Sequence, residues 1–207
     1  MMPGPPRILK TPLLGTLVKI STIRSGNTCG AQYWTDGKRE APMLPDEPWL
    51  RRQPETDELF WTDECDEAAE DSEWEDSENY RDVPYAEPPS ADDYRRALDS
   101  GLAYTPEKQR YVLMRFWWAA NDPVRHGEAS TSLPPDFDDR LTQLRALLDT
   151  SDPNERLMSA EAARQLGDFA TAEELMNFRF PEGYSHAVAL ITELIGKGDA
   201  ALHEITE

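Results

Sequence analysis

The 207-residue chain has few cysteines, few histidines and no long apolar run. Its two cysteines, Cys29 and Cys65, are too few for a disulfide framework. A membrane span needs roughly 18 consecutive apolar residues, and no stretch of the sequence approaches that length. Residues 1–10 also lack the apolar stretch of a secretory signal. We therefore expect a cytoplasmic protein without disulfides and without a membrane partner.

Positive charge is scarce as well. The chain has 21 Lys and Arg against 40 Asp and Glu, which gives a net charge of −19. So negative a chain repels phosphate backbones, and we expect no nucleic-acid partner. Hydrophobic residues make up 39% of the chain, which predicts a modest core. A protein with a basic surface is the partner that this charge favours.

Catalytic motifs are missing. The three histidines form no i,i+4 pair and no HExxH motif, and the chain has neither a glycine-rich phosphate loop nor a nucleophile elbow. Cys29 shows no sign of an adjacent base and is expected to be half-buried in a strand. The acids around Cys65 oppose formation of its thiolate. Residues 136–139 fit a helix N-terminus better than an active site. We expect no enzyme, no cofactor and no metal.

Charge divides the chain into three zones, which we take as the expected domains. Residues 1–61 carry a net charge of +1, and residues 90–207 carry −9. Between them, residues 62–89 hold 12 acids and the single base Arg81. Such an acidic block repels itself, so we expect it to be a linker or an interaction segment. It separates a β-rich head from a helical tail.

The first zone is composed of strand and turn residues. Residues 16–24 are rich in β-branched side chains and predict one half-buried strand. Asp36-Gly37 lies between two short runs and predicts a hairpin whose two central residues both have positive φ. Residues 59–61 are expected to form a last short strand.

Caps and breakers divide the last zone into amphipathic helices. Short connections predict antiparallel neighbours, hence stacked helical hairpins. The aromatic-rich residues 111–121 are expected in a buried central helix, with a ligand-binding aromatic wall as the alternative. This helix is expected to end at residues 121–123, and the sixth helix is expected to run to about Ile195 and to be stopped by Gly196 and Gly198. The expected helices begin at Ser90, Thr105, Pro134, Asp152, Asp168 and Tyr184, and a short seventh follows Asp199.

Residues 157–176, LMSAEAARQLGDFATAEELM, resemble one tetratricopeptide (TPR) hairpin. Small residues fill the first helix, Leu-Gly marks the turn, and an aromatic residue and alanine follow. A true array repeats about every 34 residues, and no clean second copy is present. The resemblance therefore implies a TPR-like helical region and nothing more specific.

Two short stretches of the head, TPLLG at residues 11–15 and QPETD at residues 53–57, resemble the zinc-knuckle pattern CPxCG without its cysteines. With the sequence between and after them, they resemble a set of uncharacterised bacterial proteins that have a zinc-ribbon-like head and a TPR-like tail. The resemblance implies an α+β fold, mostly α, in which a small hairpin-containing zinc-ribbon-like head packs on an array of antiparallel helical hairpins. It implies no activity. The four ligand positions are occupied by Thr11, Leu14, Gln53 and Thr56, none of which can supply a thiolate.

The most distinctive candidate site lies in the acidic block, where two aromatic residues are surrounded by acids. In such a segment, charge would steer a basic partner and the aromatic rings would anchor it. A disordered linker is the alternative. The expected partner-binding residues are Asp71, Glu73, Trp74, Glu75, Asp76 and Tyr80.

We therefore expect a non-catalytic protein-interaction protein, an adaptor or scaffold that uses its helical hairpins and its acidic-aromatic segment. The alternative is an acidic inhibitor of a basic partner, of the immunity-protein or antitoxin type. A carboxylate-dependent hydrolase is a second alternative. The oligomeric state stays open.

The loss of thiolates at the knuckle positions predicts that the purified protein carries no stoichiometric zinc. Elemental analysis should find far less than one zinc per chain, and chelators should leave the melting temperature unchanged. About one zinc per chain would contradict the prediction.

Overall fold

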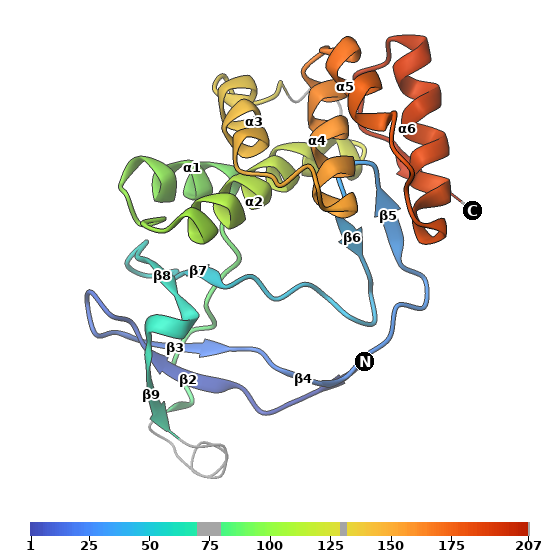
Figure 1. The fold of residues 1–207 in the computed structure, drawn as a ribbon. Coiled ribbons are helices and arrows are strands. Elements are labelled where there is room, and N and C mark those ends of the chain that lie inside the picture. Colours follow the sequence, from blue (N-terminus) through green and yellow to red (C-terminus); the bar gives the residue numbers. More distant parts are fainter. Residues whose placement is uncertain (70–79, 129–131, 207) are drawn as a thin grey trace. The chain divides into compact units, whose positions relative to one another are not determined.

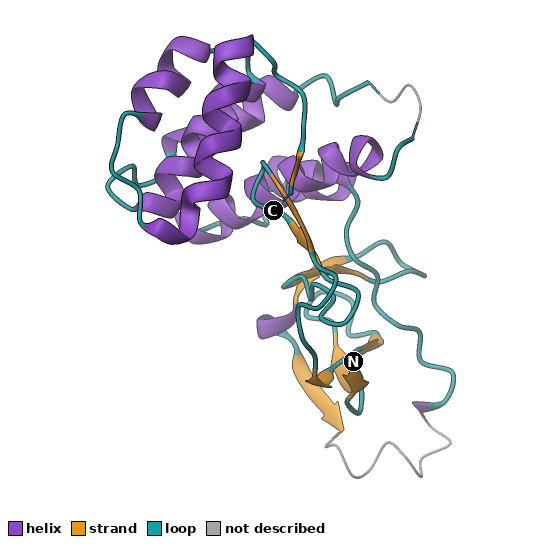
Figure 2. Cartoon of the chain, turned by 90° about the vertical axis from the view of Figure 1, so that its right-hand side faces the viewer, coloured by secondary structure: helices purple, strands orange, loops and turns teal. Residues whose placement is uncertain are grey.

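The computed structural model describes residues 1–69, 80–128 and 132–206, and within these ranges it is a mixed α+β protein with six α-helices and small antiparallel sheets (Figures 1 and 2). The expected α+β class is confirmed, and helix outweighs strand. The chain forms two compact units, which we describe separately. The head unit comprises Met1–Ala31 and Glu40–Asp93, and the helical unit comprises Gln32–Arg39 and Tyr94–Glu207.

The head unit is built from short antiparallel strands around a small apolar cluster. The central strands bury Leu9 and Val18, which pack with Ile20 and Phe60. The single strand expected over residues 16–24 is instead two strands that belong to different sheets. The sheets pair β1 (Met2–Pro3) with β4 (Ile23–Ser25), β2 (Arg7–Lys10) with β3 (Leu17–Ile20) and β9 (Asp66–Ala69), and β7 (Leu50–Arg52) with β8 (Leu59–Trp61).

Strand pairing in the head unit continues past residue 61, where the charge pattern places the end of the head. A 3₁₀ turn at Thr62–Glu64 leads into β9, and residues 84–87 later bond to β3 and β7 through bridges at Lys19–Tyr85 and Arg52–Glu87. Both ends of the acidic block are therefore structured. Repulsion among its acids does not prevent this, because backbone hydrogen bonds form whatever the side-chain charge.

The helices follow the capping signals closely. Ser90 and Asp93 form the expected capping box, in which the Asp93 N–H donates to Ser90 Oγ at 3.2 Å and the Ser90 N–H donates to Asp93 Oδ2 at 3.0 Å. Thr105, Asp152 and Asp168 also cap their helices as expected. The helices are α1 (Ala91–Asp99), α2 (Pro106–Arg125), α3 (Phe137–Ala146), α4 (Pro153–Gln165), α5 (Phe169–Met176) and α6 (Ser185–Lys197).

Two of these expectations are wrong, and a third is met only in part. Helix α2 continues through Pro123 to Arg125, because a proline in the last turn removes one hydrogen bond without ending the helix at once. Helix α6 continues past Gly196 to Lys197 and ends at Gly198, the second of the two expected stops, whose left-handed φ of 64° closes the helix. The expected seventh helix is absent from the described residues after Asp199, where strand β10 (Glu204–Ile205) lies instead.

Helix α2 forms the core of the helical unit, as expected. Its buried side chains include Val112, Phe116 and Trp117, and Phe116 packs against Phe137 of α3 with ring centroids 6.5 Å apart. Alanines at the α4–α5 contact, among them Ala160 and Ala172, are fully buried and allow close approach of the two helices. No helix in the described parts of the chain is long and apolar enough to cross a membrane.

A hairpin from the N-terminal third of the chain belongs to the helical unit. Strand β5 (Gln32–Trp34) lies between β6 (Arg39–Glu40) and the C-terminal strand β10. The Trp34 N–H donates to the Lys38 carbonyl at 3.0 Å, and only Gly37 in this turn has positive φ, at 80°. The turn is thus a three-residue loop with glycine in the left-handed position, and the expectation of positive φ at Asp36 is wrong. This geometry directs Asp36 into the helical unit.

Candidate functional site

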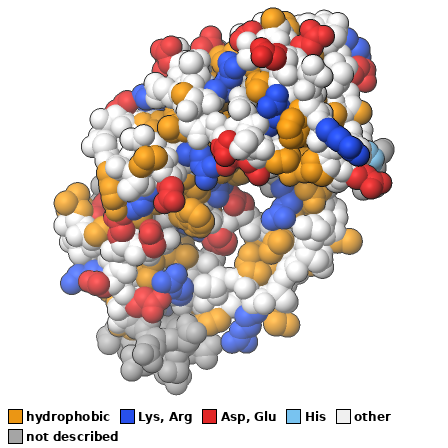
Figure 3. Space-filling view, in the orientation of Figure 1, with side chains coloured by type: hydrophobic (Ala, Val, Ile, Leu, Met, Phe, Trp, Pro, Cys, Tyr) orange, Lys and Arg blue, Asp and Glu red, His pale blue; other side chains and the backbone are white. Residues whose placement is uncertain are grey.

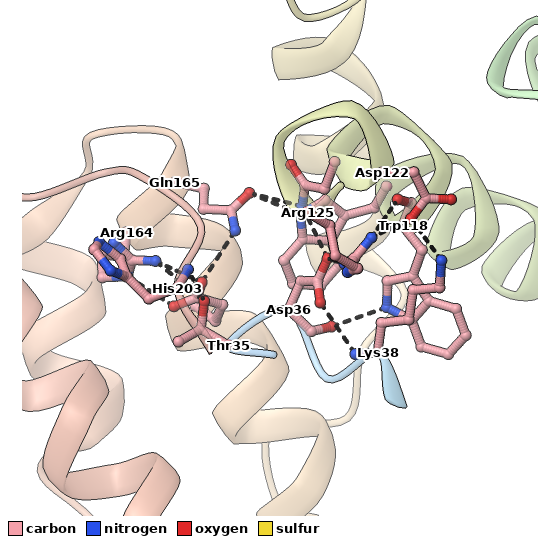
Figure 4. A network of polar contacts seen from close by, with 12 residues as sticks. Thr35, Asp36, Lys38, Trp118, Asp122, Arg125, Arg164, Gln165 and His203 are labelled. Atoms are coloured by element: carbon pink, nitrogen blue, oxygen red, sulfur yellow. Dashed lines mark hydrogen bonds and ion pairs between the residues drawn. The ribbon is translucent and has the colours of Figure 1, made fainter. Parts of the chain in front are cut away.

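A buried polar cluster in the helical unit surrounds Asp36, whose side chain is fully buried (Figure 4). Its Oδ2 atom accepts from Arg125 Nη2 at 2.5 Å and from Asn121 Nδ2 at 2.9 Å. Its Oδ1 atom accepts from the Lys38 backbone N–H at 3.1 Å, and its backbone carbonyl accepts from Trp118 Nε1 at 2.9 Å. Helix α2 and the hairpin loop are therefore joined through one carboxylate.

Arg125 is the second member of this cluster, and its side chain has no solvent exposure. It also donates to the Asp122 carboxylate and to the Trp118 carbonyl, and its guanidinium lies 5.3 Å from the centroid of the Trp34 ring. Lys38 Nζ completes the group with an ion pair of 2.5 Å to Asp122. Two cations and two carboxylates thus neutralise each other inside the protein.

Burial raises the pKa of Asp36 above its usual range, and Arg125, the Asn121 amide and the Lys38 N–H oppose this rise. The pKa in the folded state is then higher than in the unfolded chain. This group's contribution to stability is present below the unfolded-state pKa and is lost as the pH rises through the folded-state pKa. The ion pair consequently serves to position the hairpin more than to stabilise the fold.

A second buried arginine, Arg164 of α4, holds the C-terminal segment. Its guanidinium bonds both oxygens of Glu161, at 2.6 and 2.7 Å, and both side chains have no solvent exposure. It also donates to the carbonyls of Ala201, at 2.8 Å, and of Asp199. These bonds fix the chain just before strand β10.

Gln165 connects the two arginine clusters. Its Oε1 atom accepts from Trp117 Nε1 at 2.9 Å and from Asn121 Nδ2 at 3.3 Å, while its Nε2 atom donates to Glu161 at 3.0 Å. Thr35 joins the hairpin to the C-terminal segment, because its N–H donates to the His203 carbonyl at 2.9 Å. Figure 4 shows hairpin, helices and C-terminal segment meeting around these side chains.

The chemistry of this cluster is that of a structural anchor. A general base needs a lone pair that a substrate can reach. The buried carboxylates of Asp36 and Glu161 instead face cations or amides at hydrogen-bond distance and have no solvent exposure, so they do not meet this requirement. No group of three or more His, Cys, Asp or Glu within residues 1–69, 80–128 and 132–206 is placed to hold a metal ion. Sequence reasoning identified Asp36 only as a turn residue. No local signal marks Arg125 or Arg164, because both lie in stretches that contain other charged and polar residues.

A different polar site lies in the head unit, where the two knuckle-like stretches form equivalent turns. The Thr11 N–H donates to the Thr16 carbonyl and the Gln53 N–H to the Glu58 carbonyl, each at 2.9 Å. The fifth residue of each turn then donates back to the carbonyl of the first, at 3.0 Å from Gly15 and 2.9 Å from Asp57. These two donor residues have positive φ values of 67° and 57°. The two stretches thus share one backbone conformation despite different side chains.

The carboxylate of Glu58 connects the two turns. It accepts from Thr11 Oγ1 at 2.7 Å and from the backbone N–H groups of Leu13 and Leu14, at 3.0 and 3.4 Å. In the second turn, Gln53 Oε1 accepts from the Thr56 N–H at 2.7 Å. Side-chain oxygens therefore bind the N–H groups of both turns.

These residues do not fit a zinc ion. Leu14 is 55% exposed and has no ligand atom. Gln53 Oε1 is already bonded to the backbone, and the hydroxyl of Thr56 donates to it at 3.2 Å. A hydroxyl, an amide and an apolar side chain do not provide the soft or nitrogen ligands that structural zinc requires.

Most of the expected partner-binding residues, Asp71, Glu73, Trp74, Glu75 and Asp76, lie outside the described residues. Tyr80 is described and half-buried, and its hydroxyl donates to the Ala68 carbonyl of β9 at 3.2 Å. This contact gives Tyr80 a structural role.

The two cysteines lie in different surroundings. Cys29 is exposed in a turn, so the expected half-buried strand position is wrong. A following glycine, Gly30, adopts φ of 72° and ends any extended run there. Burial, together with the carboxylates of Glu58 and Glu64, raises the pKa of the Cys65 thiol to about 11.

Breaking the Asp36–Arg125 pair should destabilise the helical unit strongly. Removing Asp36 leaves the buried Arg125 with only the partly exposed Asp122 as a carboxylate partner, so we expect Asp36→Ala to lower the free energy of unfolding by about 3 kcal/mol. The measurement is urea unfolding followed by circular dichroism at the helical band. The matched control is Lys197→Met, which removes the exposed Lys197–Glu193 pair and should cost under about 1 kcal/mol. Equal effects of the two variants would contradict the anchoring role.

The thiols should differ sharply in reactivity. With a pKa of about 11, only about one Cys65 side chain in a thousand is a thiolate at pH 8. Titration with Ellman's reagent should therefore show one fast thiol per chain, which Cys29→Ser removes and Cys65→Ser keeps. Two equally fast thiols would show that Cys65 is neither shielded nor perturbed.

The fold and both polar sites can be compared with known proteins. Comparison of the chain with protein-family models, with curated proteins and with solved structures found no match in any of the three. Conclusions about function therefore come from the residues and their geometry.

Proposed function

We propose that the protein is a non-catalytic adaptor that binds a protein with a basic surface. One observation carries this proposal: Arg125, Arg164, Asp36 and Glu161 are all fully buried and bonded to one another or to backbone carbonyls. Their charges hold the hairpin and the C-terminal segment in place. Such a closed interior suits a rigid scaffold that presents its outer surface to a partner.

The outer charge supports a basic partner. The net charge is −19, and residues 62–89 contribute 12 of the 40 acids. Charge of this size accelerates association with an oppositely charged surface and selects against acidic partners. In this proposal the acidic-aromatic residues of the block, Trp74 above all, contact the partner.

We propose further that the head derives from a zinc ribbon whose ligands have been replaced. The equivalent turns at residues 11–16 and 53–58 support this, as does the Glu58 carboxylate that binds N–H groups of the first turn. For the helical unit, the alanine-rich contact between α4 and α5 supports a TPR-like hairpin. Cytoplasmic localisation fits both proposals.

An acidic inhibitor of a basic partner, of the immunity-protein or antitoxin type, is the second candidate. The density of acids in residues 62–89 favours it, because such proteins neutralise a basic active surface. The two candidates differ in outcome. Binding by an inhibitor abolishes the partner's activity, whereas binding by an adaptor leaves it intact.

The experiment is affinity purification of the full-length protein followed by mass spectrometry. We expect a stoichiometric partner with a basic surface, whose yield falls as salt is raised, since screening shortens to about 8 Å at physiological ionic strength. A partner that is retained equally at all salt concentrations, or the absence of any stoichiometric partner, would contradict the proposal.

A variant of the acidic block provides the control. Replacing its acids with Asn and Gln should slow association with the purified partner without lowering the free energy of unfolding. Trp74→Ala should act mainly on the dissociation rate. Surface-plasmon kinetics at two salt concentrations measure both effects, and unchanged rates in both variants would assign the block to a linker.

A further inference from the structure

Three aromatic side chains gather between α5 and α6, and we define them as the aromatic corner: Phe178, Phe180 and Tyr184. The rings of Phe178 and Phe180 meet edge to face with centroids 5.0 Å apart, and Phe180 and Tyr184 lie 6.3 Å apart. Phe178 is 38% exposed, and the other two are half-buried. The three rings thus form one continuous, partly exposed apolar surface.

A cation already binds one ring of the aromatic corner. The guanidinium of Arg156 lies 4.7 Å from the centroid of Phe178. Arg156 is held there by hydrogen bonds to the carbonyls of Leu175, at 2.8 Å, and of Thr150, at 3.1 Å. The Phe178 ring thus already makes a cation–π contact with a guanidinium, and the same chemistry is open to the neighbouring rings.

Three acids lie close to the aromatic corner in the sequence. Residues 173–184 include three acids, Glu173, Glu174 and Glu182, and one base, Arg179. The three acids are exposed, and in the described part of the chain their side chains have no hydrogen bond or ion pair. Figure 3 shows Asp and Glu side chains among Lys and Arg side chains on one face of the molecule. Near the aromatic corner the three acids outnumber the two bases, Arg179 and Arg156, and the three carboxylates remain available to a cationic ligand.

We propose that the aromatic corner, with Glu174 and Glu182, is the docking site for a basic peptide segment of the partner. A Lys or Arg side chain of that segment lies on the Phe180 and Tyr184 rings and pairs with these carboxylates, while a neighbouring apolar side chain covers Phe178. Charge complementarity selects this occupant, since an acidic segment would be repelled by both the local and the overall charge. The inference rests on the proposed adaptor function and names its contact surface.

The test uses the full-length protein and a displayed library of random dodecapeptides. Enriched peptides are synthesised, and their affinities are measured by fluorescence anisotropy against wild type, Phe178→Ala and Glu174→Gln/Glu182→Gln. We expect the enriched peptides to combine Lys or Arg with apolar residues. Each corner variant should bind them at least about tenfold more weakly, as expected for the loss of an interface anchor.

Matched controls separate the aromatic corner from general charge and exposure. Tyr104→Ala removes another exposed aromatic ring that faces a cation, Lys108, at 4.4 Å. Glu107→Gln/Glu128→Gln removes two exposed acids elsewhere in the helical unit. Both controls should bind the peptides within about twofold of wild type, and the Gln variants keep the fold because they leave packing unchanged.

Each outcome decides the inference. Basic peptides that lose affinity in the corner variants and keep it in the controls support it. Basic peptides that bind all variants equally overturn the docking site while leaving the adaptor function standing. Enrichment of acidic or uncharged peptides, or of none, overturns the inference. Failure of the adaptor function itself would show separately, as the absence of a salt-sensitive partner in affinity purification.

Discussion

Two buried guanidinium groups impose the main constraint on the helical unit. Arg125 and Arg164 have no solvent exposure, and an uncompensated charge in such a position is very costly. Asp36 and Asp122 compensate the first, and Glu161 and two backbone carbonyls compensate the second. Because Asp36 lies on a hairpin that is distant in sequence, the helices reach this electrostatic balance only when residues 32–39 are in place. The segment that leads into β10 is needed in the same way, because its backbone carbonyls bond the guanidinium of Arg164.

Local signals predicted much of the helical tail, and long-range pairing explains what they missed. Caps such as Ser90 and Asp152 act within one turn, so their helices begin where expected. The role of Asp36 depends on Arg125, 89 positions later in the chain. Strand β10 likewise forms because β5 offers it a partner, although a short further helix was expected after Asp199. The division into a β-rich head and a helical tail was predicted from local sequence patterns. The contacts of Asp36 with helix α2 could not be predicted in this way, because they join residues that are distant in sequence.

In the head unit, two equivalent turns are held by side-chain oxygens. Turn geometry needs acceptors for backbone N–H groups, and the Glu58 carboxylate and the Gln53 amide supply them. A resemblance in sequence pointed to these turns, but nothing in the pattern indicated that Glu58 would join them. In both units, buried charged or polar side chains thus hold distant segments together. Most of the remaining acids in the described part of the chain lie on the surface. That division between a closed interior and a negative exterior is the physical basis of the proposed binding function.

Native-state hydrogen exchange of the full-length protein tests the anchoring of the hairpin most directly. The amides of Trp34 and Thr35 donate to the carbonyls of Lys38 and His203. If the hairpin is anchored, both amides belong to the cooperative core of the helical unit. They should exchange as slowly as the buried amides of α2, with the same dependence on denaturant. Exchange of Trp34 and Thr35 at rates close to those of an unfolded chain, while α2 stays protected, would contradict the account.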